Sequence, residues 1–91
     1  MTHIHLIAVG GVGMAPLAGL FKENGYRVSG SDAGIYPPMS DMLRDIGVEI
    51  REGYGPENLK DSPDLVIVGN AVSRNNPEVQ ELLEKKLPYM S

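Results

Sequence analysis

Short apolar runs alternate with segments of helical periodicity along this chain, and that alternation constrains its fold more than any other feature. The apolar runs are bounded by Gly, Pro, Ser or Asp and predict strands: His3–Val9, Tyr26–Ser31, Val48–Arg51, Asp64–Gly69 and Pro88–Met90. The intervening segments predict helices, the third a single turn: Met14–Asn24, Met39 or Ser40 to Ile46, Pro56–Leu59 and Pro77–Lys86. Alternating strands and helices form a parallel sheet through right-handed crossovers. We therefore predict an α/β, Rossmann-like three-layer sandwich of about five parallel strands, with helices on both faces.

Length and composition fit one small globular domain. Of the 91 residues, 42% are hydrophobic and 22% charged, which excludes disorder as the default state. The absence of cysteine excludes a disulfide framework, a thiolate nucleophile and Cys-ligated zinc. A net charge of −4 without a Lys/Arg cluster argues against nucleic acid or an anionic membrane as a partner. No apolar run approaches the ~20 residues that span a bilayer, and we see no secretory signal, so we expect a cytoplasmic protein.

A glycine-rich loop, Gly10–Gly13, joins the first predicted strand to the first predicted helix. Glycines there permit a tight turn, and the amides and positive dipole of the helix attract the phosphates of a ligand. Asp32 follows about 20 residues later, where a dinucleotide fold places the acid that bonds a ribose hydroxyl. Ala8 stands at the first position of the G-x-G-x-x-G pattern. The loop predicts nucleotide or phosphosugar binding; the alternative is that its glycines only shape a turn.

Three short segments stand out beside the predicted elements: Ala8–Met14, Gly30–Asp32 and Asn76–Glu78. The first resembles the N-terminal glycine loop of the Mur ligase family, ATP-dependent enzymes that add amino acids or peptides to UDP-N-acetylmuramate for peptidoglycan. The other two match the branch of that family that adds L-alanine. Other segments are similar to the branch that recycles the tripeptide L-Ala-γ-D-Glu-meso-diaminopimelate: Asp32-Ala33 with Tyr36–Ser40, Gly53-Tyr54, Gly69–Ala71 and Arg74–Pro77. The resemblance covers nearly the whole chain, and these longer segments favour the recycling branch.

Two alternative functions stay open. The first is the alanine-adding branch, which the glycine loop resembles more than it resembles the recycling branch. That branch usually carries Gly in place of Ala8, Gly-His in place of Gly53-Tyr54 and Ser-Ser-Ala in place of Gly69–Ala71. An NAD(H)-binding regulatory or oxidoreductase domain is the second alternative, because the loop and Asp32 fit that template as well.

The resemblance implies that residues 1–91 form the first, UDP-sugar-binding domain of a larger multidomain ligase. ATP and Mg²⁺ then belong to a central domain, and the incoming peptide binds a third. The chain contains no G-x-x-x-x-G-K-[ST] motif, so we expect it to hold no ATP, to carry no catalytic or metal-binding residue and to be inactive alone. Its expected partners are UDP-N-acetylmuramate and the central and C-terminal domains of its own protein.

The predicted binding residues lie in the glycine loop and at strand ends. They are Gly10, Gly11, Val12, Gly13, Met14, Asp32, Tyr54, Asn70 and Ala71. We expect the loop amides to face the diphosphate, and Asp32 to accept from a ribose hydroxyl or the uracil N–H, or else to cap a loop. Tyr54 stands where the resemblance places a uracil-contacting His; it either contacts the base or only packs. Asn70 and Ala71 end the fourth strand, at the edge where such sheets bind ligands.

Three other polar residues are candidates for metal or phosphate ligands. His3 and His5 share one face of the first strand, but no third metal ligand accompanies them, so packing is the favoured interpretation. Arg74 could reach a phosphate or lie in solvent, and the sequence leaves both open.

Overall fold

The computed structural model describes all 91 residues and contains one five-stranded sheet. Its strands are β1 (His3–Ile7), β2 (Arg27–Asp32), β3 (Glu49–Glu52), β4 (Leu65–Val68) and β5 (Tyr89–Met90). Its helices are α1 (Met14–Glu23), α2 (Met39–Asp45) and α3 (Pro77–Lys85), with a 3₁₀ turn η1 (Pro56–Leu59). The predicted Rossmann-like α/β fold is confirmed, and no helix has the length and apolar character that crossing a membrane requires.

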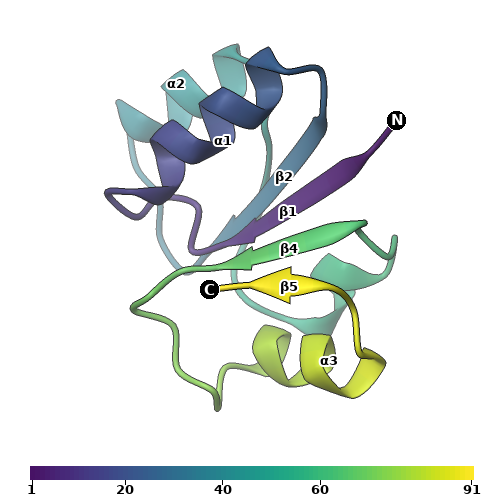
Figure 1. Ribbon diagram of the computed structural model, residues 1–91. Coiled ribbons are helices and arrows are strands. Elements are labelled where there is room, and N and C mark those ends of the chain that lie inside the picture. Colours follow the sequence, from purple (N-terminus) through teal and green to yellow (C-terminus); the bar gives the residue numbers. More distant parts are fainter.

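All neighbouring strands run parallel, in the order β3-β2-β1-β4-β5. The chain begins at the centre with β1, moves outward to β3 and then crosses back to place β4 on the other side of β1 (Figure 1). The loops that leave β1 and β4 therefore lead to helices on opposite faces. Such a reversal opens a crevice at the carboxyl edge of the sheet, where α/β folds bind their ligands.

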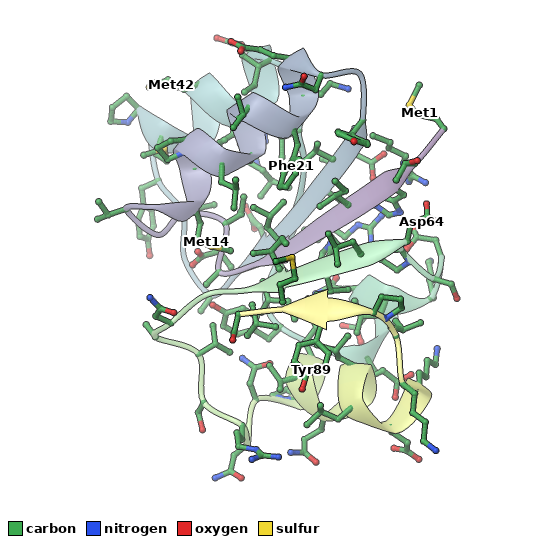
Figure 2. The ribbon with its side chains drawn as sticks, viewed as in Figure 1. Met1, Met14, Phe21, Met42, Asp64 and Tyr89 are labelled. Atoms are coloured by element: carbon green, nitrogen blue, oxygen red, sulfur yellow. The ribbon has the colours of Figure 1, made fainter.

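Helices cover both faces of the sheet. Helices α1 and α2 lie together on one face, and α3 lies on the other, beside η1 (Figure 1). Figure 2 shows Phe21 directed from α1 toward the sheet and Tyr89 on the side of α3. Phe21 meets Tyr26 edge to face, with ring centroids 5.8 Å apart, and so closes the end of the α1 layer.

Each face of the sheet has its own apolar core. The core under α1 and α2 consists of Ile4, Leu6, Val9, Ala15, Ala18, Val28, Leu43, Val48 and Ile67. The core under α3 consists of Ile7, Leu59, Val66, Val79 and Leu82. Successive strand residues point to opposite faces, so His3 and His5 share the α3 face with Ile7. That face therefore buries two imidazoles beside its aliphatic side chains.

The end of β1 differs from the prediction. The strand stops at Ile7 instead of Val9, because Ala8 adopts φ 72° and turns the chain out of the ladder. The amides of Ala8 and Val9 both donate to Ser31 O, at 2.8 and 3.0 Å. Val9 then lies over Gly30, where an added Cβ would stand 2.5 Å from Val9 Cβ. A glycine on β2 thus permits the glycine loop to start close above the sheet.

The predicted helices agree with the structure to within one residue at each end. Asn76 caps α3, and its Oδ1 accepts from the amide of Glu78 at 2.8 Å. Gly47, with φ 95°, follows α2 in the left-handed region that favours glycine. These local signals set where α2 and α3 stop and start.

Candidate functional site

A cleft of about 460 Å³ opens at the carboxyl edge between the loops that follow β1 and β4. This is the position of the crossover reversal in the sheet. The cleft is lined by Ala8, Gly11, Val12, Gly13, Met14 and Leu17 on one side, by Ile67, Val68, Gly69, Asn70 and Ala71 on the other, and by Ser91. The structure therefore brings together most of the predicted binding residues from two loops that are far apart in sequence.

The glycine loop offers fewer amides than the sequence suggests. Gly10 N donates to Asp32 Oδ2 at 2.9 Å, Gly11 N to Ala8 O at 3.0 Å, and Met14 N to Gly11 O at 3.0 Å. The amides of Val12 and Gly13 donate to no acceptor in the chain. They stand immediately before α1, where the helix dipole is positive and no acidic side chain occupies the first turn. These two amides are the ones left to bind an anion.

Asp32 lies outside the cleft wall and ties the loop to the sheet. Its Oδ2 accepts from Gly10 N, and its Oδ1 accepts from Gly34 N at 3.1 Å. A carboxylate has about four acceptor positions, so two remain for a ligand hydroxyl or N–H. The structure thus gives Asp32 the loop-capping contacts that the sequence analysis named as its alternative role.

Tyr54 also lies outside the cleft wall and follows β3 at the same edge of the sheet. Its ring packs against the core under α3. Burial raises the pKa of the Tyr54 hydroxyl, the charge of Asp32 raises it further, and a hydrogen bond with the backbone of Ala33 opposes both. Gly10 thus follows β1, Asp32 ends β2 and Tyr54 follows β3, and all three lie beside the cleft rather than within its wall.

Asn70 and Ala71 form the opposite wall and are exposed. The Asn70 side chain makes no hydrogen bond within the chain, so its amide is available to a ligand. Arg74 lies elsewhere, in an adjoining cavity of about 320 Å³ between β4, α3 and β5. The structure does not bring Arg74 to the cleft wall.

A buried polar cluster on the α3 face went unrecognised in the sequence. Glu78 and His5 are fully buried, and His5 Nε2 lies 2.7 Å from Glu78 Oε2. Ser29 Oγ lies 2.7 Å from both His5 Nδ1 and His3 Nε2. The two histidines are thus packed and hydrogen-bonded. Polar residues spaced by two on both β1 and β2 (His3 and His5, Ser29 and Ser31) were the available signal.

The charge of Glu78 is stabilised within this cluster. Burial alone would raise the pKa of the Glu78 carboxyl, but hydrogen bonds from His5, Asn58 and Ser31 outweigh it and hold that pKa below its ordinary value. Burial and then the charge of Arg27 lower the pKa of His3. The cluster therefore contains an ionised carboxylate and a neutral His3 at neutral pH.

Fold and cleft together define a Rossmann-like α/β domain with a cleft at the carboxyl edge of its sheet, and comparisons with known proteins narrow the class. Residues 3–91 match the model of the Mur ligase family, catalytic domain. The chain belongs to the Mur ligase family. It is 49% identical over 88 residues to the Escherichia coli UDP-N-acetylmuramate–L-alanyl-γ-D-glutamyl-meso-2,6-diaminoheptanedioate ligase, covering 97% of this chain and 19% of that protein.

Solved structures agree with this assignment. A murein peptide ligase from Psychrobacter arcticus matches with TM-score 0.95 and 45% identity, over 100% of this chain and 19% of that one. A UDP-N-acetylmuramate–alanine ligase from Thermotoga maritima matches with TM-score 0.88 and 31% identity, over 98% of this chain and 20% of that one. The chain spans about a fifth of the length of the curated relatives it matches.

Proposed function

We propose that this chain is the N-terminal, UDP-binding domain of an ATP-dependent ligase. The ligase would attach L-Ala-γ-D-Glu-meso-diaminopimelate to UDP-N-acetylmuramate in peptidoglycan recycling. Support comes from two relatives named as ligases of this tripeptide, with 49% and 46% identity, whereas relatives named as L-alanine ligases reach 38–41%. We expect the reaction in the cytoplasm, because it needs both ATP and a nucleotide sugar.

The observation that carries the nucleotide assignment is the pair of unpartnered amides at Val12 and Gly13. Both stand on the cleft wall at the positive end of α1, where a diphosphate accepts hydrogen bonds and meets a favourable dipole. In our proposal the uridine extends toward Asp32 and Tyr54 at the ends of β2 and β3. Asn70, on the opposite wall, then donates to or accepts from the bound UDP-sugar.

The residues of this chain do not fit ATP. Its glycine loop lacks the Lys-Ser/Thr pair that a P-loop supplies to phosphates and Mg²⁺. We therefore assign ATP, Mg²⁺ and the bond-forming chemistry to the rest of the ligase. This chain contributes by binding UDP and orienting the muramyl group, so we expect the 91-residue chain alone to ligate nothing.

An NAD(H) domain is the less favoured function. A dinucleotide site of that kind directs its acidic residue at the ribose hydroxyls. Asp32 keeps two acceptor positions that the ribose of either ligand could use, so the preference for a uridine nucleotide rests on the Mur ligase relatives and not on this carboxylate.

Thermal unfolding with a panel of ligands tests the proposed function. UDP and UDP-N-acetylmuramate should raise the melting temperature, because a ligand that binds only the folded chain adds about 2.7 kcal/mol at a hundredfold excess over Kd. NADH and ATP serve as controls and should leave the melting temperature unchanged. A shift with NADH and none with uridine nucleotides would refute the proposal.

A further inference from the structure

Glu78 is a fully buried carboxylate that gathers hydrogen bonds from four separate segments. Its Oε2 accepts from His5 Nε2 and Ser31 Oγ, both at 2.7 Å. Its Oε1 accepts from Asn58 Nδ2 at 2.6 Å and from Gly55 N at 3.3 Å. These donors belong to β1, β2, η1 and the loop between β3 and η1. One side chain of α3 thus connects the sheet to the loop that carries Tyr54.

The histidines behind Glu78 form a continuous polar chain. An ionised carboxylate only accepts hydrogen bonds, so His5 Nε2 donates to Glu78 Oε2. Ser29 Oγ lies 2.7 Å from both His5 Nδ1 and His3 Nε2 and so links the two rings. His3 Nδ1 is the one buried side-chain nitrogen or oxygen with no hydrogen-bond partner, and it lies 3.8 Å from Asp61 Oδ2. The cluster is therefore arranged around an ionised Glu78.

The loop of residues 53–55 depends on this carboxylate. Asn58 Nδ2 donates both to Glu78 Oε1 and, at 2.9 Å, to Gly53 O. Gly55 N donates to the same Oε1. Tyr54 therefore stands between two residues whose backbones are held by Glu78, one directly and one through Asn58. A glutamine at position 78 would place its NH₂ group where one carboxylate oxygen now accepts two hydrogen bonds. The two donors at that position would then face another donor and lose their acceptor.

We propose that Glu78 is a positioning residue of the nucleotide site, which holds the 53–55 loop and so sets where Tyr54 meets the uridine. The proposal rests on the proposed function for its ligand. Glu78 itself is fully buried beneath α3, so its carboxylate is shielded from a ligand in the cleft. Its effect on binding therefore passes through Tyr54, and this distinguishes positioning from a general contribution to stability.

Hydrogen exchange tests the hold on the loop without any ligand. In Glu78→Gln we expect the Gly55 amide to exchange at least tenfold faster, while the Gly69 amide, which donates to Ile7 O inside the fold, keeps its rate. The matched control is Glu81→Gln, which removes a carboxylate of the same helix that pairs with Lys85 at the surface. Equal acceleration at Gly55 and Gly69, or none at Gly55, would overturn the proposal.

A double-mutant cycle tests the route through Tyr54. Calorimetric titration with UDP should show at least fivefold weaker binding for Glu78→Gln and for Tyr54→Ala, and no further loss when the two are combined. Glu81→Gln should bind like the parent. If Glu78→Gln does not fold, Asn58→Ala takes its place, since it cuts the link to Gly53 and leaves α3 intact.

The outcomes separate the two proposals. If the losses of UDP affinity in the two single variants multiply in the double variant, the positioning role is wrong. Unchanged UDP affinity in Glu78→Gln would also contradict it. In both cases the proposed function still stands. A parent chain that binds no UDP overturns the proposed function and the positioning role together.

Discussion

At the scale of single residues, Gly11 decides whether the glycine loop keeps its two free amides. Its amide donates to Ala8 O, and its carbonyl accepts from Met14 N, so its backbone joins both ends of the loop. A Cβ added there would lie 3.3 Å from Ala8 O and 3.4 Å from Met14 Cγ, which is already tight. A larger branched side chain has no room without moving the loop.

Gly11→Val should therefore weaken UDP binding at least tenfold, because displacing the loop misdirects the amides of Val12 and Gly13. Val12→Ala should change the affinity less than twofold, since that side chain is 95% exposed and the amide remains. Calorimetric titration with UDP, together with melting curves, measures both. A folded Gly11→Val that binds like the parent would show that the loop is only a turn.

At the scale of elements, two glycines illustrate opposite packing situations. Gly30 on β2 lies beneath Val9, and a Cβ there would stand 2.5–2.7 Å from three atoms of that side chain. Gly19 lies within α1, where a Cβ would meet only Ile46 Cδ1 at 3.6 Å, an ordinary contact. The first glycine is required by close packing, and the second only loosens a helix.

We expect Gly30→Ala to lower the free energy of unfolding by about 1–3 kcal/mol through overpacking of β1 on β2. Gly19→Ala should raise it by roughly 0.5–1 kcal/mol, because alanine is the better helix former. Urea unfolding curves monitored by circular dichroism measure both changes. Equal effects of the same sign would contradict this account of the β1–β2 contact.

At the scale of the whole molecule, charged groups at the amino edge of the sheet link stability to pH. Hydrogen bonds from Arg51 lower the pKa of Asp61 from 3.8 to about 2, although burial opposes them. Burial, and then the charge of Arg27, lower the pKa of His3 from 6.5. Arg51 lies between Asp61 at 2.8 Å and Glu49 at 3.1 Å, and so connects β3 to the turn before β4.

The free energy of unfolding should fall in two steps as the pH is lowered from 7. Below about pH 6.5 the unfolded chain takes up a proton at His3 that the folded chain resists. Below about pH 3.8 the unfolded chain protonates Asp61 first, and the stabilisation from that carboxylate is lost as the pH approaches 2. Urea unfolding at a series of pH values measures both steps.

Two variants assign these steps. His3→Gln should flatten the dependence between pH 7 and 5. Asp61→Asn should reduce it below pH 4, where the lowered pKa values of Glu78 and Glu49 sustain the remainder. A parent chain whose unfolding free energy rises as the pH drops from 7 to 5 would contradict the assignment of His3 as a residue that is neutral when folded.

The kinds and order of the elements were predictable from the sequence, because apolar periodicity, glycines and helix caps act over a few residues. The capping of α3 by Asn76 and the end of α2 near Gly47 are examples. The glycine loop and Asn70 were also placed correctly at one edge, since parallel strands all end there. The predicted end of β1 at Val9 was wrong because Ala8 adopts a positive φ, a conformation that alanine rarely takes and that the sequence gives no reason to expect.

The sequence by itself determined an α/β chain with a phosphate-type loop at the start of its first helix. Only the tertiary structure decided how the loop amides are used: Gly10 N donates to Asp32 Oδ2 on a neighbouring strand, while Gly11 N and Met14 N donate to carbonyls of the loop itself. It alone decided that Glu78 is buried and ionised. The donors that offset its desolvation lie 20 to 73 residues away along the chain and meet only when the sheet, η1 and α3 pack together.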